Sequence, residues 1–259
     1  MKKSITSFAP SNASARVMHA EIISIPGNKI GSERTTGLPR WFDATVALAC
    51  LVIAAPLIVL CSIAIALTSG LPVFFRQQRV GQFGRKFDLY KLRTMKASIG
   101  GPQITTRGDT RITRLGRFLR KTKLDELPTF WNVLRGDLTL VGPRPEVPNY
   151  VNPEDPLWQK ILAVRPGLTD PVTLHLRNEE ELLARVEGDS LKFYVEELQP
   201  KKLQGYIDYL ERRDWRSDLS VLGRTMAAIV APGKMPSLDE VPAPVEGDST
   251  RVEAQLSQK

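Results

Sequence analysis

The sequence predicts an α+β fold that is mainly helical, with one membrane helix, amphipathic helices at the membrane surface and a small β-hairpin or sheet. Three observations support this class. Residues 44–68 carry no charge, two short segments rich in Val and Phe flank a glycine turn, and most other apolar residues recur at helical spacing. The predicted parts are a flexible N-terminal arm (1–39), the membrane helix (40–70), a domain on the membrane surface (71–231) and a disordered tail (232–259).

The positive charge of the chain is concentrated in one region. The 259 residues carry a net charge of +8, and residues 69–123 contain fourteen Lys or Arg against two Asp. This distribution indicates an anionic partner, which could be nucleic acid, anionic lipid or a phosphorylated substrate. Two Cys and two His exclude a disulfide framework and a zinc site, and make a Ser-His or Cys-His hydrolase a poor fit. The sequence has no nucleotide-binding glycine motif.

The uncharged run is long enough to cross the hydrocarbon core of a bilayer, which is roughly 30 Å thick. Pro56 lies near its middle and removes a backbone hydrogen bond there. Basic residues flank the run on both sides, so the positive-inside rule favours the same compartment for both ends. Two topologies remain open on these grounds: a proline-broken re-entrant helix, or a spanning helix with a proline kink.

The next segment predicts two strands, at 72–79 and 86–95, joined by a turn at Gly81 and Gly84. In the second strand Lys91 and Arg93 are two residues apart and should project from one face. That spacing suits a grip on phosphate oxygens, although two such cations are also common on a solvated face.

Residues 111–123 predict a basic amphipathic helix, in which apolar residues at helical spacing alternate with Arg and Lys. Beside a membrane helix, such a segment is expected to lie on an anionic lipid surface. Nucleic acid is the competing partner for this charge. We expect no nucleic-acid binding, because the chain shows no recognisable nucleic-acid module.

Two adjacent carboxylates, Asp125 and Glu126, follow this basic region directly. Pro128 and an apolar stripe predict a helix that begins near Asp125 and stops at Gly136, with one of the two carboxylates as its N-cap. At a helix N-terminus the partial positive charge would keep an aspartate ionised and attract phosphate. Taken alone, an aspartate before a short helix is more often only a cap.

The remaining chain predicts a strand, a rigid turn and several helices. Prolines on both sides of Arg144 would restrict its backbone and aim its guanidinium group. Arg177 precedes an acidic helix. The expected elements are a strand at 138–141, the turn at 142–145, a helix within 152–164, a loop at 165–169, a helix at 179–186, and helices over 190–231 with breaks at Pro200 and Asp214.

Several ordered motifs together resemble the bacterial sugar transferase family, the monotopic polyprenyl-phosphate phosphoglycosyl transferases. Besides the run around Pro56, they are FFRQQRVG at 74–81, YKLRTM at 90–95, RITRLGRFLRK at 111–121, LDELP at 124–128, NVLRGD at 132–137, VGPRP at 141–145 and RPGLT at 165–169. The resemblance covers residues 40–230.

The resemblance implies an enzyme that transfers a phosphosugar from a UDP-sugar donor to undecaprenyl phosphate and releases UMP. It implies Asp125 as the nucleophile of a covalent aspartyl-phosphosugar intermediate, and Glu126 as its partner in holding Mg²⁺. It further implies that Lys91, Arg120, Arg144 and Arg177 act in the active site or bind anionic groups; Arg93 is added as a substrate-binding candidate for its place beside Lys91.

The resemblance also implies a re-entrant helix broken at Pro56 and a catalytic domain on the cytoplasmic face of the bacterial inner membrane. The product would enter exopolysaccharide, O-antigen or glycoprotein glycan assembly. The chain departs from the family at residues 170–173, where many members continue with Gly and Trp, and this departure leaves the sugar open. A homodimer is also left open. The alternative function is a catalytically silent membrane-surface adaptor in a polysaccharide assembly complex.

Overall fold

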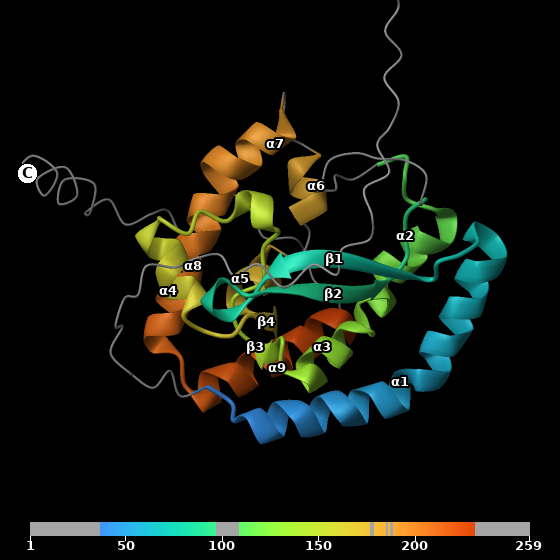
Figure 1. The fold of residues 1–259 in the computed structure, drawn as a ribbon, viewed down its shortest axis with the longest axis horizontal. Coiled ribbons are helices and arrows are strands. Elements are labelled where there is room, and N and C mark those ends of the chain that lie inside the picture. Colours follow the sequence, from blue (N-terminus) through green and yellow to red (C-terminus); the bar gives the residue numbers. More distant parts are fainter. Residues whose placement is uncertain (1–36, 97–108, 177–178, 185, 187–188, 231–259) are drawn as a thin grey trace, which may run out of the picture.

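The computed structural model describes residues 37–96, 109–176, 179–184, 186 and 189–230. Residues 1–36 of the predicted arm (1–39), the predicted tail (232–259) and Arg177 lie outside these ranges. Figure 1 shows a body of short helices around two small sheets, with one long helix wrapped along its edge. The architecture is therefore mainly helical with a small β component, as the sequence predicts.

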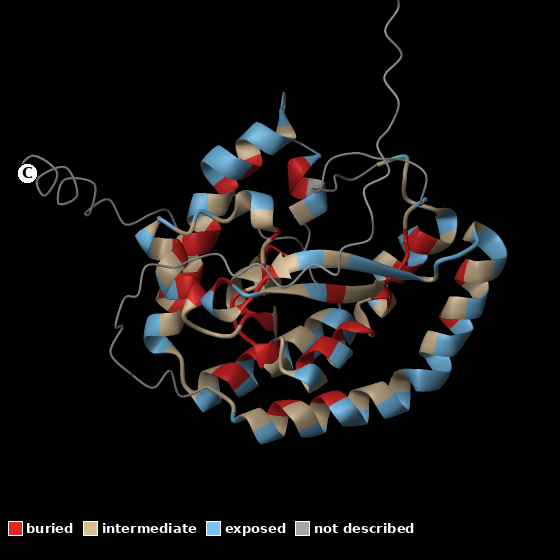
Figure 2. Ribbon diagram, in the orientation of Figure 1, coloured by how far each residue is buried: buried red, intermediate tan, exposed pale blue. Residues whose placement is uncertain are grey.

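The long helix is α1, Arg40–Ser69, which contains Pro56 in its interior. Among the described residues it is the one helix that is long and apolar enough to cross a membrane. An 18-residue stretch within it has a mean hydropathy of 2.9, and 11% of that stretch is buried. Figure 2 shows its buried positions on the side that faces the domain. Large side chains such as Ile53 and Leu67 are 78% and 82% exposed, so most of the outward surface of α1 is apolar and uncovered.

Both ends of α1 are fastened to the same domain. Near its N-terminus, Asp43 is buried and accepts hydrogen bonds from the Thr139 hydroxyl, at 2.6 Å, and from the Leu140 N–H, at 3.1 Å. At its C-terminus, Arg93 donates to the carbonyls of Ser69 and Gly70. Figure 1 shows the helix curving around the body between these two anchors.

The strands form two separate pairs. β1, Phe74–Val80, and β2, Lys86–Leu92, are antiparallel, with Phe75 opposite Lys91, as expected for a hairpin with a glycine turn. β3, Thr139–Val141, pairs in parallel with β4, Gly167–Thr169. The sequence predicts a loop at 165–169, and this prediction is wrong for Gly167–Thr169, because their strand depends on pairing with the distant β3.

Helices cover these sheets, and most apolar burial lies between them. The main core joins Ala47 of α1 to Val133, Leu140 and Val221. The helices after α1 are α2, Arg114–Lys121; α3, Thr129–Arg135; α4, Pro156–Leu162; α5, Pro171–His175; α6, Glu179–Leu183; α7, Ser190–Phe193; α8, Gln199–Arg212; and α9, Trp215–Val230. A π-helical segment, Tyr194–Leu198, joins α7 to α8.

The basic helix α2 packs against Thr94, which lies just after the end of β2. Its Gly116 lies so close to the Thr94 carbonyl that a Cβ atom there would be 2.0 Å from the oxygen. Only glycine permits this approach. The Thr113 hydroxyl caps the helix by accepting from the Gly116 N–H at 2.9 Å.

Candidate active site

The two adjacent carboxylates lie in a tight turn and not at a helix cap. Lys123 adopts a left-handed conformation with φ 59°, and residues Leu124–Glu126 then form a 3₁₀ turn that leads into α3. The N-cap of α3 is Pro128, without a side-chain cap bond. The prediction that Asp125 or Glu126 caps the helix is therefore wrong. Because neither carboxylate caps α3, Glu126 is left to contact cations from other elements.

Glu126 is held by two cations from distant parts of the chain. Lys91 Nζ, from β2, lies 2.8 Å from Glu126 Oε1, and Arg144 Nη2, from the proline-rich turn, lies 2.9 Å from the same oxygen. Burial opposes ionisation of Glu126, but these two positive charges outweigh it and hold its pKa well below the ordinary value. Glu126 is therefore a carboxylate at neutral pH. In turn, its charge raises the pKa of Arg144.

Asp125 is in the opposite electrostatic state. Its residue is 6% exposed, and Oδ1 is buried without a hydrogen-bond partner among the described residues. Burial, together with the negative charge of Glu126, raises the pKa of Asp125 to about 6, although Lys91, Lys123 and Arg120 act against the rise. The prediction that a helix N-terminus keeps Asp125 ionised is thus wrong, because burial raises the pKa of this carboxyl more than the nearby positive charges lower it. A carboxyl that titrates near neutral pH and keeps one oxygen unpaired is suited to attack an electrophile.

The pair is positioned by contacts between α3 and β2. Asn132 is fully buried, and its side chain forms two hydrogen bonds to the backbone of β2. It accepts from the Tyr90 N–H at 3.1 Å and donates to the Asp88 carbonyl at 2.7 Å. The Thr129 hydroxyl donates to the Tyr90 carbonyl at 2.9 Å. These bonds fix the helix that follows Glu126 against the strand that carries Lys91.

The other predicted site residues are placed differently. Arg120 donates to the Thr94 hydroxyl and forms an ion pair with Glu180 at 2.5 Å, while its charge still acts on Asp125. Arg93 is buried and contacts the end of α1, so the structure does not bring it to Glu126. Lys91, which the sequence predicts on the same face of the strand as Arg93, is the residue that contacts Glu126. The position of Arg177 lies outside the described residues.

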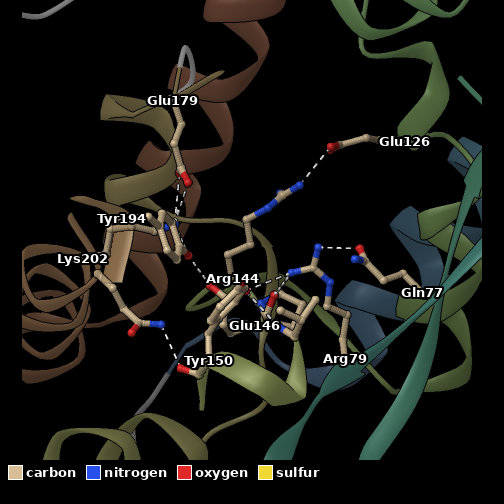
Figure 3. Close-up of polar contacts among 12 residues, drawn as sticks. Gln77, Arg79, Glu126, Arg144, Glu146, Tyr150, Glu179, Tyr194 and Lys202 are labelled. Carbon is tan, nitrogen blue, oxygen red and sulfur yellow. Dashed lines mark hydrogen bonds and ion pairs between the residues drawn. The ribbon is translucent and has the colours of Figure 1, made fainter. Parts of the chain in front are cut away.

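A pocket opens beside Glu126, and it contains a cation that the sequence reasoning missed. Its lining includes Lys91, Glu126 and Arg144, together with Arg79 from β1. Figure 3 shows Arg79 beside Arg144, with Glu146 next to both. In the sequence Arg79 looks like an ordinary solvated strand residue. Its ion-pair partner, Glu146, is 67 residues away, so no local pattern could have revealed the pair.

The carboxylates are also the candidate ligands for a metal ion. The described residues contain no group of three or more His, Cys, Asp or Glu that could hold one. Mg²⁺, however, commonly binds through one or two carboxylates plus the phosphates of its substrate. The unpaired Oδ1 of Asp125 and the neighbouring carboxylate of Glu126 fit that mode.

Comparison with known proteins identifies the family of the chain. The family of bacterial sugar transferases matches residues 34–232. A UDP-glucose:undecaprenyl-phosphate glucose-1-phosphate transferase of Caulobacter vibrioides is 37% identical over 196 residues, which are 74% of this chain and 69% of that protein. An undecaprenyl-phosphate galactose phosphotransferase of Salmonella typhimurium is 34% identical over 184 residues, 63% of this chain and 38% of the relative.

A third relative differs again in its sugar. A UDP-N-acetylgalactosamine-undecaprenyl-phosphate N-acetylgalactosaminephosphotransferase of Aeromonas hydrophila is 39% identical over 137 residues, which are 51% of this chain and 32% of that protein. The names of all three relatives describe transferases that act with undecaprenyl phosphate. With its paired carboxylates and one long apolar helix, the chain has the parts of a membrane-associated transferase. It belongs to the bacterial sugar transferase family.

Proposed function

We propose that this protein transfers a phosphosugar from a UDP-sugar to undecaprenyl phosphate, giving a polyprenyl diphosphate sugar and UMP. The observation that carries the proposal is Asp125, a buried carboxyl with an unpaired oxygen, set beside a glutamate that two cations hold. The family and the names of the relatives support the reaction class. Because the relatives use different sugars, the proposal leaves the sugar open.

Two displacements account for the transfer. In the first, an oxygen of ionised Asp125 attacks the phosphorus that carries the sugar, and the bond to the UMP oxygen breaks. In the second, an oxygen of undecaprenyl phosphate attacks the same phosphorus, and the aspartyl carboxylate leaves unchanged. The covalent intermediate lets the donor and the lipid use one site in turn. Lys91 and Arg144, already placed by Glu126, would offset the negative charge of the phosphoryl oxygens.

We further propose that Asp125 and Glu126 hold Mg²⁺ together with the donor phosphates. When bound, the ion would neutralise phosphoryl charge and make phosphorus more open to attack. The structure supports two further roles: burial limits the access of water to Asp125, and Glu126 holds Lys91 and Arg144 beside it.

We propose a re-entrant path for α1, with the catalytic domain on the cytoplasmic face of the inner membrane. A straight helix of this length would measure about 45 Å, which would separate its ends widely. Here both ends are fastened to one domain, through Asp43 and Arg93. Pro56 removes one backbone hydrogen bond and is the natural place for the chain to turn. The anchor would keep Asp125 near the level of the lipid phosphate.

The proposal is tested by release of UMP. Purified full-length protein is mixed with Mg²⁺, undecaprenyl phosphate and a panel of UDP-sugars. We expect the wild type to release UMP with at least one donor, and Asp125→Asn to reduce the rate at least 10³-fold, because an amide cannot form the acyl phosphate. The matched control is Asp208→Asn, on α8, which should keep the wild-type rate.

Unchanged UMP release by Asp125→Asn would remove the nucleophile assignment. A wild type that binds membranes but releases no UMP with any donor would favour the adaptor function instead.

A further inference from the structure

The wall of the pocket contains a third cation whose bonding differs from that of the other two. Lys91 and Arg144 both donate to Glu126 Oε1. Arg79, which lines the same pocket, donates to Glu146 Oε1 at 3.4 Å, to the Pro145 carbonyl at 2.9 Å and to the Gln77 side chain at 2.7 Å. Arg79 therefore bonds to Glu146 and its neighbours, whereas Lys91 and Arg144 bond to Glu126.

Arg79 and Arg144 also repel one another. Burial, together with the charge of Arg144, lowers the pKa of Arg79 and outweighs the opposing effect of Glu146. The Arg79 ion pair is long, and Glu146 shares its charge with other donors, because its Oε1 also accepts from the Val147 N–H at 2.8 Å. An anionic group in the pocket would relieve this repulsion and would gain from both guanidinium groups.

A chain of buried hydrogen bonds fixes Glu146 in turn (Figure 3). The Tyr194 hydroxyl donates to Glu146 Oε2 and accepts from Lys202 Nζ at 3.3 Å. Lys202 forms an ion pair with Glu179 of α6 at 3.0 Å. Each group thus has one consistent role: the ammonium donates to the hydroxyl, the hydroxyl donates to the carboxylate, and the carboxylate accepts from Arg79.

We propose that Arg79 is an additional phosphate-binding residue of this site, and that Tyr194 is a positioning residue that acts through Glu146. This inference rests on the proposed function, since it takes the phosphate to belong to a substrate. Two substrates bring a phosphate, the nucleotide donor and the lipid acceptor. Arg79 would bind a phosphate group, which both substrates share. The experiment distinguishes the phosphate of the nucleotide from that of the lipid.

The test of Arg79 is a binding measurement on full-length protein in nanodiscs. UDP is titrated in one arm and undecaprenyl phosphate in the other. We expect Arg79→Gln to weaken binding at least tenfold in one of the two arms, and Arg79→Lys to weaken it less. Arg76→Gln removes the same charge from an exposed position of the same strand, so it should bind both probes within twofold of the wild type.

The test of Tyr194 separates positioning from folding. Tyr194→Phe keeps the ring but removes the hydroxyl donor. We expect a three- to tenfold higher KM for the substrate that Arg79 binds, with kcat changed less than twofold. Tyr150→Phe is the matched control, because its ring lies 5.8 Å from that of Tyr194 and its hydroxyl is outside the described chain of bonds. It should leave both constants unchanged.

Equal binding of both probes by Arg79→Gln and the wild type would overturn the role of Arg79. An unchanged KM in Tyr194→Phe would overturn the positioning role of Tyr194. A wild type that binds neither probe would contradict the proposed function itself, and with it this inference. Binding by the wild type together with equal binding by Arg79→Gln would leave the proposed function standing.

Discussion

Asp125 and Glu126 are neighbours in the chain, yet their surroundings give them opposite charge preferences. Glu126 meets Lys91 and Arg144 directly, and its pKa is lowered. Asp125 is buried with an unpaired oxygen, and its pKa is raised to about 6. Two carboxyls whose pKa values are shifted in opposite directions at one site are typical of enzymes in which each carboxyl has a different catalytic role. Here the charged member would organise the cations, and the titrating member would react.

The raised pKa of Asp125 predicts how stability depends on pH. A carboxyl whose pKa is about 6 when folded and about 3.8 when unfolded binds its proton more tightly in the folded protein. Its favourable contribution is complete below pH 4 and is lost as the pH rises through 6. Asp125→Asn should therefore increase the free energy of unfolding by up to about 3 kcal/mol at pH 7.5.

The measurement is unfolding of full-length protein at a series of pH values. The gain from Asp125→Asn should shrink as the pH falls and should vanish near pH 4. A variant that is less stable than the wild type at pH 7.5 would show that the carboxylate, and not its neutral form, is favoured by the folded site.

At the scale of elements, the hairpin and the helix α3 form the frame of the site. Sequence patterns predicted both strands of the hairpin, the basic helix α2 and the strand β3, because each has apolar spacing or a glycine turn of its own. They missed β4 and the pairing of Arg79 with Glu146, which depend on contacts between distant segments. Local patterns identified Asp125, Lys91 and Arg144 as candidates. They could not identify the buried amide of Asn132 as the link between α3, which follows Asp125, and β2, which carries Lys91.

Replacing Asn132 should therefore separate α3 from β2. Asn132→Ala removes bonds to the Tyr90 N–H and the Asp88 carbonyl and leaves these backbone groups without partners. We expect a loss of about 2–4 kcal/mol in the free energy of unfolding, measured with denaturant in detergent. The exposed Asn152→Ala is the control and should cost less than about 1 kcal/mol. A cost for Asn132→Ala no greater than that of the control would contradict the role of this link.

In the molecule as a whole, the domain and the long apolar helix α1 are joined as one body. Both anchors of α1 involve buried side chains of the domain or of the helix, and its outward surface is apolar and exposed. Under the proposed function, this arrangement would keep Asp125 close to the bilayer surface, where the lipid substrate lies. The basic helix α2 packs near the C-terminal end of α1, where Leu119 belongs to one apolar cluster with Cys61 and Ile65.

The proposed path of α1 predicts that both of its ends are on the cytoplasmic side. The test uses single cysteines at Thr36 and Leu71 in a chain whose Cys50 and Cys61 have been replaced by alanine. In intact cells, a thiol reagent that does not cross the inner membrane should label neither position, whereas it should label both after permeabilisation. Labelling of either single cysteine in intact cells would indicate a spanning helix.

The most direct test of the central claim is mass spectrometry of the protein incubated with a UDP-sugar and Mg²⁺ in the absence of lipid acceptor. We expect a mass increase equal to one phosphosugar on the peptide that contains Asp125, and its loss when undecaprenyl phosphate is added. Asp125→Asn should show no adduct. A phosphosugar attached to another residue, or full transfer activity by Asp125→Asn, would rule out Asp125 as the nucleophile.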